Sequence, residues 1–407
     1  MEIQKKLRNS PGNRIEIQQC QEVIDKSIIL EETNSRFYIE PDIALAKTLN
    51  TAFYTDPELF GISRKKIFQR SWQFIGDESL VAQQGSCFPF TLLEEFLDEP
   101  LLLTKDRDQI NCLSNVCTHR GTTLVGAACQ SSHIRCRYHG RQFRLDGSFL
   151  SMPEFKEVKN FPTPADNLTR LPLHRWGRLL FTSLDLKADS KKYFQAMEKR
   201  LSWLPLNEFV FKPELSTEYL VNAHWALYCE NYLEGFHIPF VHAGLNAVID
   251  FGAYTTETFE LSNLQLGLAK SGEEIFDLPK ESPDHGKKVA AYYFFVFPNM
   301  MFNFYPWGLS INLVQPVSMN RTRVSFYTYL WKEELYNRGA GSGLDVVEME
   351  DEEVVEAVQK GVHSSFYHQG RYSVTREQGI HHFHRMISDA IGSESYRSSV
   401  NETGAND

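Results

Sequence analysis

Two short loops, each with one cysteine and one histidine, limit what this chain can fold into more than any other part of its sequence. The first loop is Cys117-Thr-His119-Arg120-Gly121, and the second is Cys136-Arg-Tyr138-His139-Gly140. Sixteen residues separate His119 from Cys136, so the pattern is C-x-H followed by C-x-x-H. Four metal-ligating side chains at such short spacings indicate an inorganic centre held between two facing loops.

The order of the ligands distinguishes two kinds of centre. Tetrahedral zinc accepts two cysteines and two histidines, but zinc loops usually pair C-x2-4-C with H-x3-5-H. Here each loop mixes the two ligand types. That arrangement suits a Rieske [2Fe–2S] centre, in which two cysteines bind one iron and two histidines bind the other. The spacing therefore favours an iron–sulfur cluster over zinc.

A second set of candidate ligands includes His237 and His242. On a straight helix two residues five apart lie about 140° from each other, so they could not share a metal. Pro239 stands between them and is expected to end or kink the helix, which would let both imidazoles converge. A non-haem Fe(II) site that activates O₂ uses two histidines and one carboxylate, and leaves positions open for O₂ and substrate.

The carboxylate that completes this set is expected in the acidic stretch 348–359, which is predicted to be a helix. On that helix Asp351 lies on an apolar stripe formed by Val347, Val354, Val355 and Val358. A carboxylate on a buried face is costly unless it is paired or bound to metal. We therefore predict Asp351 as the third ligand, with Glu350 and Glu348 as substitutes; a solvated acidic helix is the alternative interpretation.

These motifs resemble those of the Rieske non-haem iron oxygenases, specifically the terminal oxygenase (alpha) subunit, over about residues 37–391. The resemblance implies a [2Fe–2S] cluster and a mononuclear Fe(II). The implied cluster ligands are Cys117, His119, Cys136 and His139, and the implied iron ligands are His237, His242 and Asp351.

Glu234 precedes His237 by three residues and is expected to share a helix face with it. In the family, a carboxylate here links an iron-bound histidine to a cluster histidine of the neighbouring subunit and carries electron flow between them. Glu rather than Asp at this position resembles the branch that acts on quaternary ammonium compounds such as choline, betaine or carnitine. The resemblance gives Asn231 no catalytic role. Arg141 departs from many relatives, which have Trp there, and is expected to alter the surface near the cluster.

The predicted fold class is α+β, with a small all-β Rieske domain and a catalytic domain whose antiparallel β-sheet is flanked by helices. Helices are expected from Pro41 and from the cap-like Thr55-Asp56-Pro57-Glu58, and a hairpin is expected at Asp146-Gly147. Strands are expected at 288–297 and 301–313. The predicted divisions are a poorly ordered extension (1–36), a helical lead-in (37–71), the Rieske domain (72–185), a helical connector (186–212), the catalytic domain (213–390) and a frayed tail (391–407).

Composition limits the partners of the protein. A net charge of −10 argues against nucleic acid, which needs a basic surface. The sequence has neither an apolar run of about 18 residues nor a hydrophobic leader, so neither membrane insertion nor secretion is expected. Seven irregularly spaced cysteines suit a reducing, cytoplasmic compartment. Those outside the two loops are expected to be free thiols: Cys20, Cys87, Cys112, Cys129 and Cys229.

The sequence contains no G-x-G-x-x-G after a strand, so flavin and nicotinamide sites are expected on a separate NAD(P)H-dependent reductase. The resemblance also implies a homo-oligomer, a trimer or a multiple of one. We consider three functions: hydroxylation of a quaternary ammonium compound, hydroxylation of an aromatic or alicyclic substrate, and electron transfer without catalysis. The aromatic run 292–307 fits either of the first two, because it could hold a flat ring or cage a trimethylammonium by cation–π attraction. The histidines at 381, 382 and 384 are expected to pack or hydrogen-bond and not to bind metal.

Overall fold

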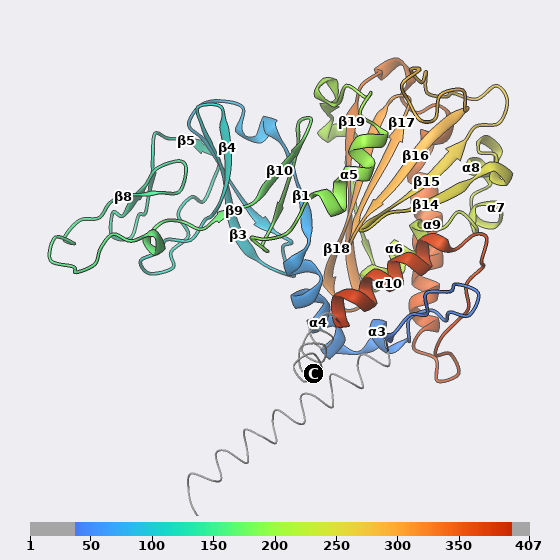
Figure 1. The fold of residues 1–407 in the computed structure, drawn as a ribbon, viewed down its shortest axis with the longest axis horizontal. Helices are drawn as coiled ribbons and strands as arrows, with labels where there is room; N and C mark the ends of the chain where they lie inside the picture. Colours follow the sequence, from blue (N-terminus) through green and yellow to red (C-terminus); the bar gives the residue numbers. More distant parts are fainter. Residues whose placement is uncertain (1–36, 393–407) are drawn as a thin grey trace, which may run out of the picture.

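The computed structural model describes residues 37–392, which form two β-rich parts joined by helices (Figure 1). The predicted extension at 1–36 and nearly all of the predicted tail at 391–407 lie outside these residues. The lead-in contains α3 (Ala52–Thr55) and α4 (Pro57–Lys66). As predicted, α4 starts at a cap: the Asp56 side chain accepts from the backbone N–H of Glu58. The helix expected from Pro41 does not form, and residues 41–45 form bends and turns.

The first β-rich part contains three small antiparallel sheets. The hairpin predicted at Asp146-Gly147 is confirmed, with Gly147 in the left-handed region at φ +87°. The strands are β1 (Trp72–Asp77), β10 (Leu173–Trp176) and β11 (Leu179–Ser183) in one sheet; β2 (Ser86–Leu92), β3 (Glu99–Asp106), β4 (Gln109–Ser114), β5 (Cys129–Gln130) and β9 (Arg170–Leu171) in the second; and β6 (Ile134–Arg135), β7 (Gln142–Phe143) and β8 (Phe149–Ser151) in the third.

The second part is built on one eight-stranded antiparallel sheet in the order β12-β19-β18-β17-β16-β15-β14, with β13 also paired to β19. One predicted strand, 301–313, is wrong as a single element, because a two-residue turn at Pro306-Trp307 divides it into β17 and β18. The strands are β12 (Val210–Phe211), β13 (Thr217–Val221), β14 (Thr255–Thr258), β15 (Ser262–Leu268), β16 (Val289–Val296), β17 (Met300–Tyr305), β18 (Gly308–Ser318) and β19 (Arg321–Leu330).

Helices flank this sheet, so the α+β class is confirmed (Figure 1). α5 (Lys191–Arg200) packs against β15 and β16, between the two β-rich parts. The others are α6 (Trp225–Tyr232), α7 (Ile238–Val241), α8 (Ala243–Val248), α9 (Leu344–Gly361) and α10 (Gln378–Gly392).

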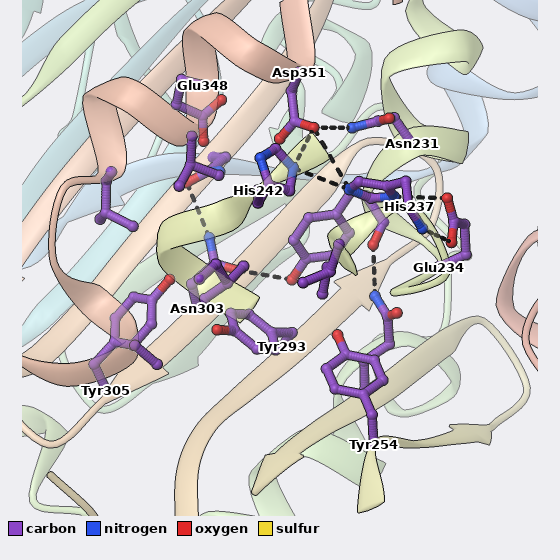
Figure 2. Close-up of a pocket in the computed structure, with 18 residues that line it drawn as sticks. Asn231, Glu234, His237, His242, Tyr254, Tyr293, Asn303, Tyr305, Glu348 and Asp351 are labelled. Carbon is purple, nitrogen blue, oxygen red and sulfur yellow. Dashed lines mark hydrogen bonds and ion pairs between the residues drawn. The ribbon is translucent and has the colours of Figure 1, made fainter. Parts of the chain in front are cut away.

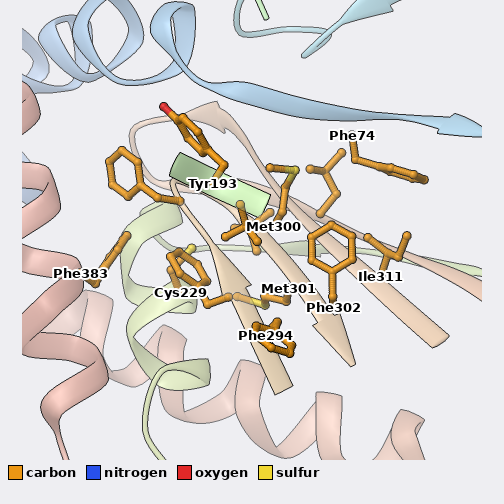
Figure 3. Packing of buried hydrophobic residues seen from close by; sticks show 14 of the residues in the cluster. Phe74, Tyr193, Cys229, Phe294, Met300, Met301, Phe302, Ile311 and Phe383 are labelled. Atoms are coloured by element: carbon orange, nitrogen blue, oxygen red, sulfur yellow. The ribbon is translucent and has the colours of Figure 1, made fainter. Parts of the chain in front are cut away.

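Neighbouring rows of the large sheet face opposite sides. Phe294, Phe302 and Ile311 lie directly across from one another on β16, β17 and β18, and all three are buried in the hydrophobic core (Figure 3). The next row, Tyr293, Asn303 and Ser310, points the other way, because side chains alternate along a strand. The sheet therefore presents an apolar face to the core and a more polar face to the far side.

The two β-rich parts share one hydrophobic core. Phe74 of β1 contacts Tyr327 of β19 with ring centroids 5.4 Å apart, and Phe181 of β11 lies 6.0 Å from Phe302. Burying one such phenylalanine stabilises a fold by about 1.5–3 kcal/mol. A smaller, separate core that includes Cys117, Cys136 and Phe143 supports the cysteine–histidine loops.

Two candidate metal centres

Both cysteine–histidine loops have the same backbone turn. In each, the glycine N–H donates to the carbonyl of the cysteine four positions earlier, at 3.0 Å for Gly121 and 3.1 Å for Gly140. Both glycines are left-handed, with φ of +71° and +75°, a conformation that costs other residues energy. The glycine that ends each motif is therefore what closes the loop.

The four candidate ligands separate into two pairs. The thiols of Cys117 and Cys136 are buried, and burial raises the pKa of Cys117, with a further contribution from the Cys136 thiol beside it. The imidazoles of His119 and His139 are more exposed, with ring centroids 4.8 Å apart. Among residues 37–392, one set of three or more histidine, cysteine or acidic side chains brings all its ligand atoms within 4.8 Å of one another. That set does not include any of these four residues.

This arrangement favours a cluster over zinc. Tetrahedral zinc would need all four ligand atoms around one point. A pair of buried sulfurs and a pair of outer imidazoles instead fit the two irons of a Rieske centre. The donor set therefore fits the [2Fe–2S] group.

The second centre lies where α6 ends and two short helices follow. α6 stops at Tyr232, and His237 begins α7 while His242 ends it. The predicted break is present, but it precedes Pro239, which stands in the first turn of α7. Proline is tolerated there because the first N–H groups of a helix have no intrahelical partner.

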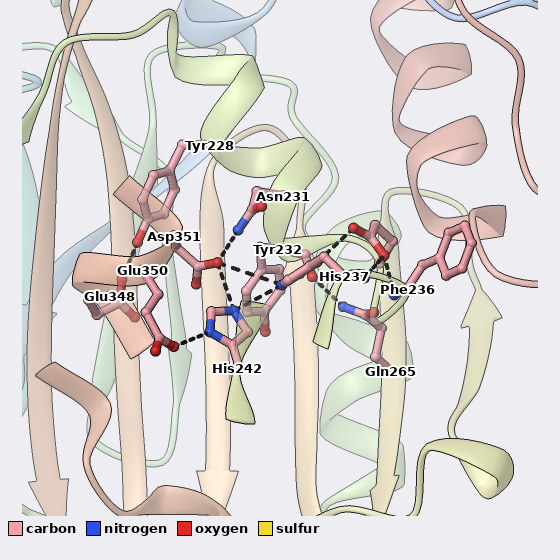
Figure 4. A network of polar contacts seen from close by, with 11 residues as sticks. Tyr228, Asn231, Tyr232, Phe236, His237, His242, Gln265, Glu348, Glu350 and Asp351 are labelled. Carbon is pink, nitrogen blue, oxygen red and sulfur yellow. Dashed lines mark hydrogen bonds and ion pairs between the residues drawn. The ribbon is translucent and has the colours of Figure 1, made fainter. Parts of the chain in front are cut away.

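Three ligand atoms meet at this break (Figure 4). His242 Nε2 lies 3.1 Å from His237 Nε2 and 2.9 Å from Asp351 Oδ1, and His237 Nε2 lies 3.6 Å from the same oxygen. These three residues are the set whose ligand atoms all lie within 4.8 Å of one another. Two imidazoles and a carboxylate on one side of a point fit an iron site with open positions.

The other ring nitrogen of each histidine contacts a carboxylate. His237 Nδ1 lies 2.6 Å from Glu234 Oε1, and His242 Nδ1 lies 2.7 Å from Glu350 Oε2. Burial lowers the pKa of His242, but Asp351 and Glu350 more than offset this and raise it to about 9. Metal-binding histidines usually make such a second contact, which fixes the ring. Glu350, a substitute ligand in the sequence analysis, thus lies behind His242.

Asp351 comes from α9 and is held by Asn231, whose Nδ2 donates to Asp351 Oδ1 at 2.6 Å. No sequence signal had pointed to this contact. The predicted apolar stripe of α9 is partly wrong: Val358 is 44% exposed, whereas Val355 and Gln359 are buried. The buried face is thus rotated from the predicted one, and Asp351 stands at its edge with a side chain 15% exposed.

A cavity of about 90 Å³ adjoins the ligand atoms (Figure 2). Glu348 lines it and accepts a hydrogen bond from Tyr228, while burial and the nearby Asp351 raise the pKa of Glu348 to about 8. The described lining contains acids, amides and tyrosines but no lysine or arginine. Its aromatic and amide members are Tyr232, Tyr254, Tyr293, Tyr305, Asn231, Asn303, Asn312 and Gln265.

The C-terminal histidines have hydrogen-bond partners, as expected. His381 Nε2 lies 2.7 Å from the carbonyl of Glu40, and His384 Nδ1 lies 2.6 Å from the hydroxyl of Tyr372. His382 is likewise bonded to a side-chain amide. The described cysteines outside the loops are free, and Cys20 lies outside the described residues.

Family models match most of the chain. The model described as the Rieske [2Fe-2S] domain matches residues 71–162, and that of the ring hydroxylating alpha subunit (catalytic domain) matches residues 211–393. No helix among the described residues is long and apolar enough to cross a membrane.

Curated relatives match over most of their length. Choline monooxygenase, chloroplastic, from Arabidopsis thaliana is 30% identical over 370 residues, which cover 86% of this chain and 84% of the relative. The carnitine monooxygenase oxygenase subunit of Escherichia coli (strain K12) is 28% identical over 367 residues, which cover 85% of this chain and 94% of the relative.

Solved structures share the fold. A quaternary ammonium Rieske monooxygenase superposes with a TM-score of 0.69 at 23% identity, covering 87% of this chain and all of that chain. Naphthalene 1,2-dioxygenase from Rhodococcus sp. superposes with a TM-score of 0.63 at 19% identity, covering 86% of this chain and 95% of that one. At these identities the likeness concerns the fold alone.

Proposed function

The chain belongs to the Rieske non-haem iron oxygenases, as an oxygenase (alpha) subunit, and on that premise we propose that it hydroxylates a small quaternary ammonium compound whose other end is uncharged. It is an oxidoreductase that incorporates molecular oxygen, and its cofactors are a [2Fe–2S] cluster and a mononuclear iron. The single observation that carries the substrate proposal is the composition of the cavity beside His237, His242 and Asp351.

That cavity suits a cation. Tyr254, Tyr293 and Tyr305 present aromatic rings, and ring faces attract quaternary ammonium groups. Glu348 adds a carboxyl group whose ionised form a bound cation would favour, and the described lining residues include no lysine or arginine. A zwitterion such as carnitine would bring its own carboxylate into a lining that offers no lysine or arginine, so a choline-like alcohol fits better.

An uncharged polar end of the substrate could hydrogen-bond to the side-chain amides that line the cavity. The Gln265 side chain is buried and donates through Nε2 to the Tyr232 carbonyl at 2.5 Å, while its Oε1 has no partner among the described residues. A buried acceptor without a donor is unfavourable, so a substrate hydroxyl that donates to it would gain affinity.

We assign the metal ligands as the sequence predicted: Cys117, His119, Cys136 and His139 would hold the cluster, and His237, His242 and Asp351 would hold the iron. When bound, the iron supplies O₂ activation and the cluster supplies electrons. Replacing one C–H by C–OH uses one oxygen atom of O₂, two electrons and two protons, and releases the other oxygen as water. The residues of the chain orient the substrate and keep the two histidine rings fixed through Glu234 and Glu350.

The electrons come from elsewhere. The family works as an oligomer with a separate reductase, and we propose an NAD(P)H-dependent one and a trimer. In one chain the cluster loops, near β5 and β8, lie at the opposite end from α7 and α8 (Figure 1). This separation supports transfer from a neighbouring subunit, with Glu234 as the link to His237.

The test is an electron paramagnetic resonance spectrum of anaerobic, iron-loaded protein treated with nitric oxide, with choline, carnitine and benzoate added separately. We expect a high-spin ferrous-nitrosyl signal that changes with choline and much less with carnitine. A change with benzoate alone would favour an aromatic substrate. A change with carnitine alone would refute the proposal that the other end of the substrate is uncharged. Absence of the nitrosyl signal beside an intact reduced cluster would leave an electron carrier.

A further inference from the structure

Arg141, which follows the second loop directly, is a buried charge and not the surface residue that the sequence suggested. Its side chain is 2% exposed. Three rings surround the guanidinium, with centroids 5.6 Å away for Phe143, 5.1 Å for Phe149 and 5.4 Å for Phe161. The backbone of Arg141 is part of the loop turn, because its carbonyl accepts from the N–H of Cys136 at 2.8 Å.

Asp166 is the ionic partner of Arg141. One guanidinium nitrogen, Nη2, donates to Asp166 Oδ1 at 2.8 Å and to the Asp166 carbonyl at 3.0 Å. Hydrogen bonds from Arg141 and then from Thr163 lower the pKa of Asp166, so the carboxyl stays ionised. The Nε–H of Arg141 is buried and has no acceptor among the described residues, so its charge is only partly compensated.

The same aspartate joins the two loops. Its carbonyl also accepts from the Thr118 hydroxyl at 2.9 Å, and Thr118 stands between Cys117 and His119. One carbonyl oxygen thus receives hydrogen bonds from the first loop and from the residue after the second. The ion pair is therefore attached to both loops that present the cluster ligands.

We propose that Arg141 and Asp166 are positioning residues that set the reduction potential of the cluster, with Arg141 raising the potential and Asp166 lowering it. Reduction adds one negative charge to the centre, so a nearby buried cation favours the reduced form and a nearby anion opposes it. Buried charges are screened far less than exposed ones. The potentials of such clusters depend on the charge around them. This inference concerns electron delivery and holds for any substrate.

The test compares midpoint potentials in redox titrations of the purified, cluster-loaded full chain, followed by electron paramagnetic resonance. For Arg141→Gln we expect a lower potential, corresponding to about a tenfold change in the equilibrium constant of one-electron reduction, or ~59 mV. For Asp166→Asn we expect a higher potential, because Arg141 then lacks its counter-charge. The double variant should return towards the wild-type value.

Two further variants separate charge from packing. Arg141→Lys keeps the cation and should lie nearer the wild type than Arg141→Gln. Lys156→Gln removes an exposed charge from the same region and should leave the potential unchanged. Shifts of the same sign in both single variants, or no shift with the cluster retained, would overturn the proposal. If Arg141→Gln does not retain its cluster, the test depends on Asp166→Asn alone. A midpoint potential of Asp166→Asn that is not higher than that of the wild type would then contradict the proposal.

Discussion

Adjacent acids on α9 have different tasks, which shows how much a single position matters here. Asp351 places an oxygen beside both histidines of the proposed iron site, whereas Glu350 contacts the far nitrogen of His242. Helical geometry separates them, because successive residues project about 100° apart. Sequence reasoning could select the stretch and rank Asp351 first, but it could not see which acid would lie behind a histidine from a distant segment.

Asp351→Ala should abolish turnover and remove the mononuclear iron while the cluster stays bound. The change deletes one of the three proposed ligand atoms and leaves the other domain untouched. Iron content, together with the cluster signal after reduction, measures both effects. Glu353→Ala, an exposed acid two residues later, is the matched control and should keep both metals. Full iron content in Asp351→Ala would argue that another acid is the ligand.

Glu350→Ala should weaken iron binding by about 10–100-fold, the usual cost of losing a partner behind a metal-bound histidine. Glu350→Gln keeps an oxygen that can accept from His242 Nδ1 and should lose less. Competition with a chelator measures the affinity. Equal affinities for the wild type and Glu350→Ala would show that His242 needs no such support.

At the scale of elements, the sequence predicts structure correctly where local backbone preferences determine it, and less well where packing between segments determines it. The cap of α4 and the hairpin at Asp146-Gly147 follow from backbone preferences, and both are present. The exposed position of Val358 depends on how α9 packs against the distant α6, and the burial of Arg141 depends on how Phe149, Phe161 and Asp166 close around it. Their partners are joined only by the fold, so periodicity alone could not place them.

The loop glycines allow a prediction at this scale. Gly121→Ala should destabilise the loop by about 1–2 kcal/mol, the cost of a left-handed conformation for other residues. Gly140→Ala should cost more, because its new Cβ would also approach Pro153 Cγ to 3.3 Å. The temperature at which visible cluster absorbance is lost reports both. Gly126→Ala, at ordinary φ and with open space, is the control, and an equal drop there would refute the argument.

For the whole molecule, the distance between cluster and iron along one chain matters most. Two defective chains should rescue each other if electrons cross between subunits: His119→Ala lacks a proposed cluster ligand, and Asp351→Ala lacks a proposed iron ligand. Each alone should be inactive. Co-assembled oligomers should regain a measurable part of the wild-type rate in substrate-dependent O₂ consumption. Inactivity of verified mixed oligomers would mean that transfer occurs within one chain.

The opposed rows of the large sheet have a consequence for how such an enzyme can diversify. Tyr293 and Asn303 line the cavity, while Phe294 and Phe302, their immediate neighbours in the chain, are buried in the core behind it. Substitutions in the first row can reshape the chamber without opening holes in the second. Single substitutions in the first row can thus change substrate preference and leave folding intact. A directed-evolution library confined to that row should retain an unusually high share of soluble variants.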